Sequence, residues 1–201
     1  DGQDFSFAEL NGIPKVRMMK SSFVPGGILF LTPPNQSHTL MSWQVQEVED
    51  FSGHLVGFDA FNAYRIERGC AWFGIDLNEK TVPLEANLES AIHFDKGCYP
   101  GQETIAKITN LGHPAKKFVR LNIETVSPIE PGTELKSEGK SAGKITSSAP
   151  QPGGLTTFAI AAVKWPFREE GKDLEFEAGG QTHTAHVIGP AGPAVEIERE
   201  T

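Results

Sequence analysis

The sequence has few cysteines and lacks long hydrophobic runs. Its two cysteines, Cys70 and Cys98, stand well apart in the 201-residue chain, which excludes a disulfide scaffold. No apolar run approaches the roughly 20 residues that a membrane-spanning helix needs. The polar start at Asp1 also lacks the pattern of a signal peptide. We therefore expect a cytoplasmic protein with no membrane contact.

Basic residues are scarce as well. Lys and Arg number 18 against 26 Asp and Glu, which gives a net charge of −8. Residues 1–112 carry 8 basic and 14 acidic side chains, and residues 113–201 carry 10 and 12. Neither part has the basic surplus that binding to nucleic-acid phosphates requires. The densest cationic stretch, residues 107–120, is interpreted as a solvated linker face, with an RNA contact as the alternative. We do not expect direct nucleic-acid binding.

The first half of the chain has mainly helical patterns. Apolar residues recur at three- and four-residue spacings in residues 38–51 and 58–68, which predicts two helices. Gly69 is a natural stop for the second of them, and a third, shorter helix is predicted over residues 85–92. Ahead of these helices, residues 16–19 and 27–31 predict two strands. Two strands alone are marginally stable, so we expect a further N-terminal segment to complete this sheet.

The second half reads as short strands separated by glycine turns. The candidate strands alternate apolar and polar residues over 118–123, 133–139, 141–148, 156–165, 173–179 and 182–188. Hairpin turns are predicted at residues 141–143 and 179–181. Six such strands indicate a small antiparallel barrel or sandwich. The predicted fold class is therefore α+β, with an α+β region over residues 1–112 and a β-barrel over residues 113–201.

Two short motifs do not support a catalytic site. Residues 139–143 match the G-x-S-x-G nucleophile elbow, but that motif must be followed by a helix, and a strand is predicted here. His183 and His186 are three residues apart on a predicted strand, which sends their side chains to opposite faces. We predict no metal site.

Residues 94–104 are harder to explain by structure alone. The segment places Lys96, Cys98, Tyr99, Gln102 and Glu103 close together between glycines and a proline. A thiol near a cation ionises more readily, because positive charge favours the thiolate. The chemistry alone leaves two alternatives open for Cys98, a reactive thiol and a buried inert one.

Residues 96–103 (KGCYPGQE) resemble the signature of the YgfZ-type folate-binding proteins, which are relatives of the aminomethyltransferase (T-protein) of the glycine cleavage system. Further similar segments precede it in the order and near the spacing of that family, at residues 57–60, 65–69, 72–77 and 82–86. The resemblance covers nearly the whole chain from about residue 12. Proteins of this family are longer at the N-terminus, so the resemblance implies that the first half of the folate-binding domain is missing from this chain. In T-proteins that half carries the main catalytic aspartate.

Two departures favour the YgfZ type over a true aminomethyltransferase. T-proteins place a pterin-binding glutamate just after the turn that matches residues 25–27, where this chain has Ile28 and Leu29. Leucine cannot accept the hydrogen bonds of a pterin edge, and each unpaired polar group costs about 1–3 kcal/mol. T-proteins also generally lack a thiol at the position of Cys98.

The resemblance implies that tetrahydrofolate or a folate derivative is the cofactor. Arg65 suits the carboxylates of its glutamate tail, and Trp72 and Phe73 offer flat apolar surface for its rings. The alternative for Arg65 is that it completes the end of its own helix and pairs locally with Glu67. The alternative for Trp72 and Phe73 is that they are ordinary core aromatics. Tyr99, Gln102 and Glu103 are the further candidate folate-binding residues.

Cys98 is the predicted catalytic residue, with Lys96 as its activating neighbour. The leading hypothesis is a folate-binding protein that supports iron–sulfur enzymes and, through them, tRNA modification. A single thiolate does not hold a cluster, so a partner would supply the other ligands. The alternatives are an aminomethyltransferase that acts with a lipoylated carrier protein and tetrahydrofolate, and an RNA-binding module.

Overall fold

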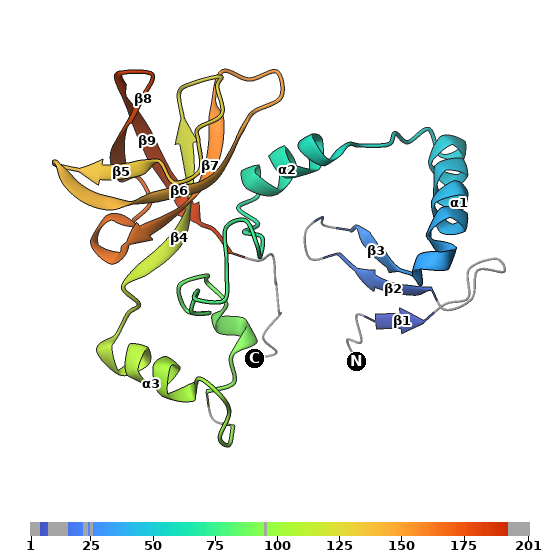
Figure 1. The fold of residues 1–201 in the computed structure, drawn as a ribbon, viewed down its shortest axis with the longest axis horizontal. Coiled ribbons are helices and arrows are strands. Elements are labelled where there is room, and N and C mark those ends of the chain that lie inside the picture. Colours follow the sequence, from blue (N-terminus) through green and yellow to red (C-terminus); the bar gives the residue numbers. More distant parts are fainter. Residues whose placement is uncertain (1–4, 8–15, 22–23, 25, 95, 193–201) are drawn as a thin grey trace. The chain divides into compact units, whose positions relative to one another are not determined.

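The computed structural model describes residues 5–7, 16–21, 24, 26–94 and 96–192. They form two compact units, Asp1–Phe58 and Asp59–Thr201, which are described separately below (Figure 1). The predicted boundary near residue 112 lies within the second unit, between a helix and the first barrel strand, and stays a prediction. None of the helices in the described ranges combines the length and the apolar character that crossing a bilayer needs.

The first unit is a three-stranded antiparallel sheet followed by a helix. Its strands pair in the order β1 (Phe5–Phe7), β2 (Arg17–Lys20) and β3 (Ile28–Leu31). The two predicted strands are β2 and β3, and Gly26 adopts the left-handed φ of 73° in the turn between them. Helix α1 (Ser37–Asp50) matches the predicted helix, and its Leu40 packs against Val16.

Helix α2 (Phe58–Glu67) confirms the second predicted helix and its glycine stop. Gly69 has a φ of +74°, and the N–H of Cys70 donates to the carbonyl of Arg65 to close the helix end. Ile66 is fully buried and packs in a cluster with Phe118 and Ile160, which belong to the barrel strands. The end of α2 is therefore anchored on the barrel.

The predicted helix over residues 85–92 is wrong. This segment forms successive turns, and only η2 (Glu89–Ala91) completes a short 3₁₀ helix. Asn87 has a left-handed φ of 57°, and its side-chain amide donates to the carbonyls of Phe118 and Ala191. Hydrogen bonds to the barrel thus replace those of a helix.

Helix α3 (Gln102–Leu111) was not predicted from the sequence. It begins after Gly101 and ends at Gly112, which both have a φ of +89°, and Ile105 is its buried residue. The interpretation of residues 107–120 as a linker face is wrong, because this stretch contains the end of α3 and the start of strand β4 (Lys116–Ile123).

The C-terminal part is the predicted antiparallel β-barrel (Figure 1). Six strands close in the order β4-β7-β6-β5-β8-β9. Besides β4, they are β5 (Glu134–Ser137), β6 (Lys140–Pro150), β7 (Thr157–Lys164), β8 (Asp173–Ala178) and β9 (Gln181–Pro190). Alternate residues of β4 point inward, and Val119, Leu121 and Ile123 join the barrel core.

One of the two predicted hairpin turns is correct. Gly179 and Gly180 have left-handed φ values between β8 and β9, as expected. Residues 141–143, by contrast, lie inside β6, and the β5–β6 turn is made by Glu138 and Gly139, both left-handed. A strand follows residues 139–143 rather than a helix, so the rejection of the nucleophile elbow is confirmed. His183 and His186 do lie on opposite faces of β9, one stacked on Phe176 and the other bound to Asp173.

Candidate functional site

Arg65 lies at the centre of a buried polar network in the second unit. It is fully buried near the end of α2, where its Nη1 donates to Asp76 Oδ2 at 2.7 Å and to the Cys70 carbonyl at 3.1 Å. Its Nε donates to Asn62 Oδ1 at 2.8 Å. Its Nη2 is buried and has no hydrogen-bond partner among the described residues.

The carboxylate of Asp76 completes this network. Oδ2 also accepts from the backbone N–H of Trp72 at 3.0 Å. Oδ1 accepts from the hydroxyls of Thr146 and Ser147, each at 2.6 Å. Both groups are on β6, so the Arg65–Asp76 pair ties α2 and the loop after it to the barrel wall. A buried ion pair of this kind requires hydrogen bonds to its remaining polar atoms, and Asp76 has them on both oxygens.

This geometry differs from the local pair that the sequence suggested for Arg65. Glu67 is exposed, and the carboxylate beside Arg65 is that of Asp76. Sequence reasoning missed Asp76, although a lone carboxylate within the apolar run of residues 72–77 was a signal. The role of Arg65 in folate binding stays a prediction. In that role, its Nη2 would be the donor to the ligand, because it has no partner among the described residues.

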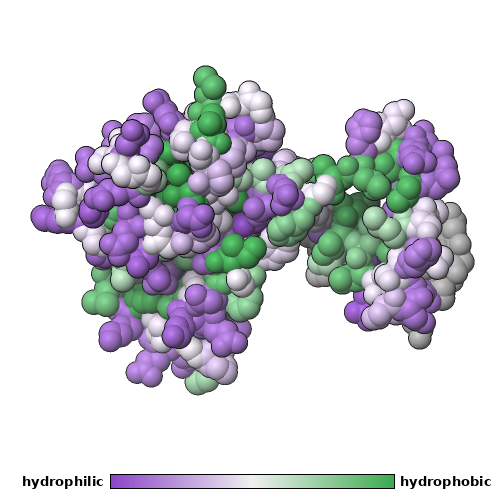
Figure 2. All heavy atoms as spheres, turned by 45° about the horizontal axis from the view of Figure 1, so that its top comes forward, coloured by the Kyte–Doolittle hydropathy of each residue, from purple (hydrophilic) through white to green (hydrophobic). Residues whose placement is uncertain are grey.

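The two neighbouring aromatic side chains have different surroundings. Trp72 is half-buried, meets Phe61 edge-on with ring centroids 5.5 Å apart, and lies 5.7 Å from the Arg65 guanidinium carbon. Phe73 is 64% exposed, and Gly74 follows it in a left-handed turn. Phe73 is thus one of several large apolar side chains on the surface, where Figure 2 shows apolar patches among polar ones.

The segment 96–103 forms an exposed loop that leads into α3. Cys98 is exposed, which excludes the buried setting, and the reactivity of its thiol stays a prediction. The Lys96 ammonium lies 4.8 Å from the centroid of the Tyr99 ring. The Tyr99 N–H donates to Gln102 Oε1 at 3.2 Å, which joins the loop to the first turn of α3. Glu103 is exposed in that same turn.

The structure therefore gives two groups of candidate residues. Arg65 and Trp72 lie together, and Lys96, Tyr99 and Gln102 lie together. Arg65 has no hydrogen bond or ion pair with any residue of the loop 96–103, all of which the structure describes. Within the described ranges, no group of three or more His, Cys, Asp or Glu side chains could hold a metal ion.

The second cysteine has a structural setting. Cys70 is 2% exposed, and burial raises the pKa of its thiol despite the opposing charges of Arg68, Arg65 and Arg120. Its backbone pairs with Gly192 in an isolated bridge. Among the two thiols, Cys98 is the accessible one.

Two of the four Lys and Arg side chains in residues 107–120 lie beside carboxylates of the protein. Lys117 forms an ion pair with Glu89, and Lys116 lies 3.7 Å from Glu85. The Arg120 side chain packs against Gly69. These contacts reduce the free positive charge that an RNA backbone would require.

Comparison with solved structures identifies the fold. The chain is similar to the glycine cleavage system aminomethyltransferase T of Bartonella henselae, with a TM-score of 0.74 and 23% sequence identity. The match covers 97% of this chain and 51% of the solved one. The α+β arrangement with a closed barrel is thus that of a T-protein.

Curated relatives agree with this fold. An Arabidopsis thaliana chloroplast protein named as a transferase, At1g60990, is 33% identical over 109 residues, which are 54% of this chain and 25% of that protein. The aminomethyltransferase of Nostoc sp. is 29% identical over 133 residues, or 66% of this chain and 35% of that enzyme. The chain therefore matches only about a third of the length of such enzymes. No family model matches the chain. These likenesses support a relationship of the chain to the glycine cleavage T-protein superfamily.

Proposed function

We propose that this chain is part of a folate-binding protein of the YgfZ type, which supports iron–sulfur enzymes and through them tRNA modification. The observation that carries the proposal is the exposed loop 96–103. Lys96, Cys98, Gln102 and Glu103 are all exposed there, so packing in the core does not explain why these residue types occur. A loop that presents a thiol, an ammonium, an amide and a carboxylate to its surroundings suits recognition of a ligand or a partner.

Tetrahydrofolate or a related folate is the ligand class of this proposal. The exposed ring of Phe73 offers a flat apolar surface for the pterin or aminobenzoyl ring. Arg65 Nη2 is a buried donor without a partner among the described residues, so a carboxylate of the glutamate tail would satisfy it. Trp72 supports Arg65, and Tyr99, Gln102 and Glu103 are the remaining candidate contacts.

Cys98 is the proposed reactive group of this protein. Two roles fit an exposed thiol: chemistry on a one-carbon unit carried by the folate, and transient contact with an iron–sulfur species on a partner enzyme. Because Cys70 is buried, Cys98 would supply one thiolate and the partner the other ligands.

Folate binding is tested directly by calorimetry with tetrahydrofolate. Phe73→Ala should weaken binding about tenfold, in line with the value of an aromatic contact, without lowering the melting temperature, since the ring is exposed. Leu155→Ala is the matched control, because Leu155 is another exposed apolar side chain of the second unit. Equal affinity of both variants would contradict the assignment of Phe73.

The role of the thiol is tested by complementation of a strain that lacks the homologous protein. Cys98→Ala should fail to restore activity of its iron–sulfur enzymes, whereas Cys70→Ala should restore it at equal protein levels. Full rescue by Cys98→Ala would contradict a thiol role and leave the folate proposal to the binding measurement.

A second candidate function is aminomethyl transfer, and its support is the similarity to proteins named aminomethyltransferase. In this reaction the aminomethyl unit on a lipoylated carrier protein gives its one-carbon unit to tetrahydrofolate and releases ammonia. The resemblance counts against this candidate at one point. T-proteins place the pterin-binding glutamate near the positions of Ile28 and Leu29, which are apolar here and are both exposed in β3. Formation of methylenetetrahydrofolate from both substrates at T-protein rates would favour this candidate over the first.

A further inference from the structure

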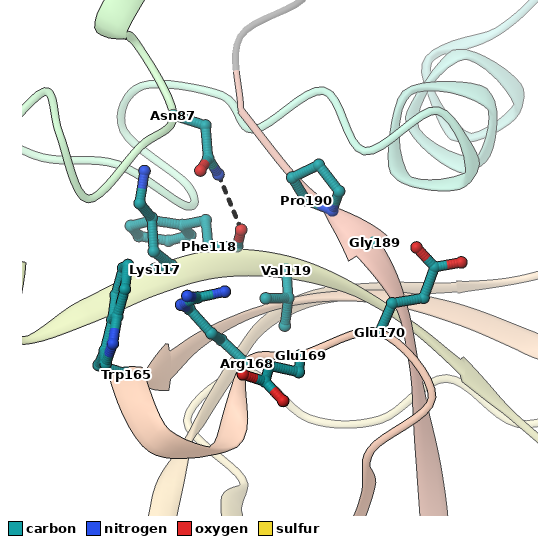
Figure 3. Close-up of a pocket in the computed structure, with 10 residues that line it drawn as sticks. All are labelled: Asn87, Lys117, Phe118, Val119, Trp165, Arg168, Glu169, Glu170, Gly189 and Pro190. Atoms are coloured by element: carbon teal, nitrogen blue, oxygen red, sulfur yellow. Dashed lines mark hydrogen bonds between the residues drawn. The ribbon is translucent and has the colours of Figure 1, made fainter. Parts of the chain in front are cut away.

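A cavity of about 440 Å³ lies beside the barrel, where β4 meets the segment that follows β7 (Figure 3). Its polar lining includes Lys117, Asn87, Arg168 and Glu170, and its apolar lining includes Trp165 and Val119. The volume is within the range of small-molecule sites. No residue of the loop 96–103 lines it, so the inference is independent of the folate proposal.

Arg168 is held in place in this cavity. Its guanidinium carbon lies 3.5 Å from the centroid of the Trp165 ring, and the His113 ring stacks on the same indole at 4.4 Å and 8°. Two planar groups this close cannot share one face, so the indole lies between the imidazole and the guanidinium. A guanidinium held flat is preorganised for a planar carboxylate, because less freedom is lost on binding.

Arg168 is also unpaired. It forms no ion pair with any described residue, and its Nε is buried without a hydrogen-bond partner among them. The other polar donors are engaged, since Lys117 pairs with Glu89 and the Asn87 amide donates to two carbonyls. Arg168 is therefore the cation of the described lining that remains for an anion.

The opposite side of the cavity carries negative charge. Figure 3 shows the Arg168 guanidinium and the Glu170 carboxylate on either side of Val119. Glu170 forms no ion pair within the described residues, whereas Glu169, which also lines the cavity, lies on the Arg168 side in Figure 3. A ligand with two negative ends would meet like charge there, whereas a protonated amine would be attracted.

The geometry points to a binding site for a small amino-carboxylate whose two charges lie at opposite ends. Its carboxylate pairs with Arg168 beside Trp165, its apolar middle passes along the wall that β4 forms, and its ammonium pairs with Glu170. At the Arg168 end, the ligand would supply a partner to a guanidinium whose buried Nε has none among the described residues, which is otherwise costly. At the other end, its ammonium would pair with the exposed carboxylate of Glu170.

Four probes of equal chain length separate the contributions of the two ends. 6-Aminohexanoate carries both charges, hexanoate only the carboxylate, hexylamine only the amine, and adipate two carboxylates. Binding is followed through the indole N–H signal of Trp165 in NMR spectra, assigned with Trp165→Phe. We expect 6-aminohexanoate to bind most tightly and adipate most weakly. Equal effects of all four probes on the Trp165 signal, or no change of that signal with 6-aminohexanoate, would overturn the proposal.

Variants test each contact. Arg168→Gln should weaken binding of 6-aminohexanoate and hexanoate about tenfold or more, as expected for a charge-assisted bond. Glu170→Gln should leave hexanoate unchanged and remove the advantage of 6-aminohexanoate over it. Glu177→Gln, an exposed carboxylate on β8 outside the cavity, is the matched control. Arg168→Lys keeps the positive charge but loses the planar guanidinium that binds a carboxylate through two N–H groups. It should also weaken binding, and it replaces Arg168→Gln in the test if that variant does not fold. Unchanged binding by both Arg168 variants would contradict the site.

Discussion

Arg65 and Asp76 form a buried ion pair, with 2.7 Å between Nη1 and Oδ2 and at most 1% of either side chain exposed. Thr146 and Ser147 on β6 donate to the other oxygen of the same carboxylate. The pair therefore joins the end of α2 to the barrel wall. Its loss would leave a guanidinium buried without its counter-charge, which is far more costly than the loss of an exposed pair.

Asp76→Asn should lower the free energy of unfolding by about 3–5 kcal/mol. The amide keeps the volume of the side chain but removes the charge that balances Arg65. Glu177→Gln is the control, since it removes an exposed carboxylate that lies 3.2 Å from Lys136 and should cost less than about 1 kcal/mol. Urea denaturation measures both. Similar losses in the two variants would show that the buried pair contributes no more than a surface one.

Gly69 is required for a second reason besides its helix-ending conformation. A Cβ at this position would lie 2.4 Å from Cδ of Arg120, and the φ is +74°. Gly112 has a φ of +89°, and a Cβ added there would meet no atom within 4 Å, so this glycine isolates the cost of the backbone conformation.

Gly69→Ala should therefore be more destabilising than Gly112→Ala, which should cost about 1–2 kcal/mol. The excess should disappear when Arg120 is shortened to Ala, because the colliding side-chain atoms are then absent. Thermal unfolding of the single and double variants measures the difference. Equal costs at both glycines in the unaltered background would exclude the predicted collision.

Periodicity and turn residues predicted most of the fold. The six barrel strands, α1, α2, and the glycine stop at Gly69 follow from local pattern, because alternation and helical spacing directly reflect which face is buried. Residues 85–92 were mispredicted because Asn87 bonds to carbonyls at residues 118 and 191, far along the chain. Such tertiary contacts override local helical preference and leave no local signal.

The candidate site was only partly predictable for the same reason. The loop 96–103 was identified by its chemistry, but its continuation into α3 was missed, although Gly101 and Gly112 mark both helix ends. The pairing of Arg65 with Asp76 depends on β6, and the stack of Arg168 on Trp165 depends on how the chain leaves β7. Neither follows from spacing in the sequence.

Asn87 should be sensitive to loss of its amide donors. Its Nδ2 donates to the Phe118 carbonyl at 2.9 Å and to the Ala191 carbonyl at 2.6 Å. Asn87→Asp removes both donors and places a carboxylate against two carbonyls, so unfolding free energy should fall by about 2 kcal/mol or more. Asn78→Asp is the control, because Asn78 uses its oxygen to accept from the Lys80 N–H and aspartate retains that acceptor. A smaller effect at residue 87 than at residue 78 would contradict the assignment.

The two cysteines should differ strongly in reactivity. An aromatic disulfide reagent should modify Cys98 rapidly in the native protein and Cys70 only as the protein unfolds, since Cys98 is exposed and Cys70 is 2% exposed. Cys98→Ala should remove the fast phase, and Cys70→Ala should preserve it. A fast phase that persists in Cys98→Ala would show that Cys70 is accessible.

The raised pKa of Cys70 also predicts a pH dependence of stability. Burial favours the neutral thiol in the folded protein, so the folded-state pKa lies above that of the unfolded chain. The contribution of this thiol to stability is therefore complete below the unfolded pKa of about 8.5 and is lost as the pH rises through the folded pKa. Denaturation at a series of pH values from about 7 to 10 should show a steeper alkaline decline for the unaltered protein than for Cys70→Ala. Comparison of the two slopes removes the contributions of all other ionisable groups, which are the same in both proteins. Identical slopes would mean that ionisation of Cys70 does not differ between the folded and unfolded states.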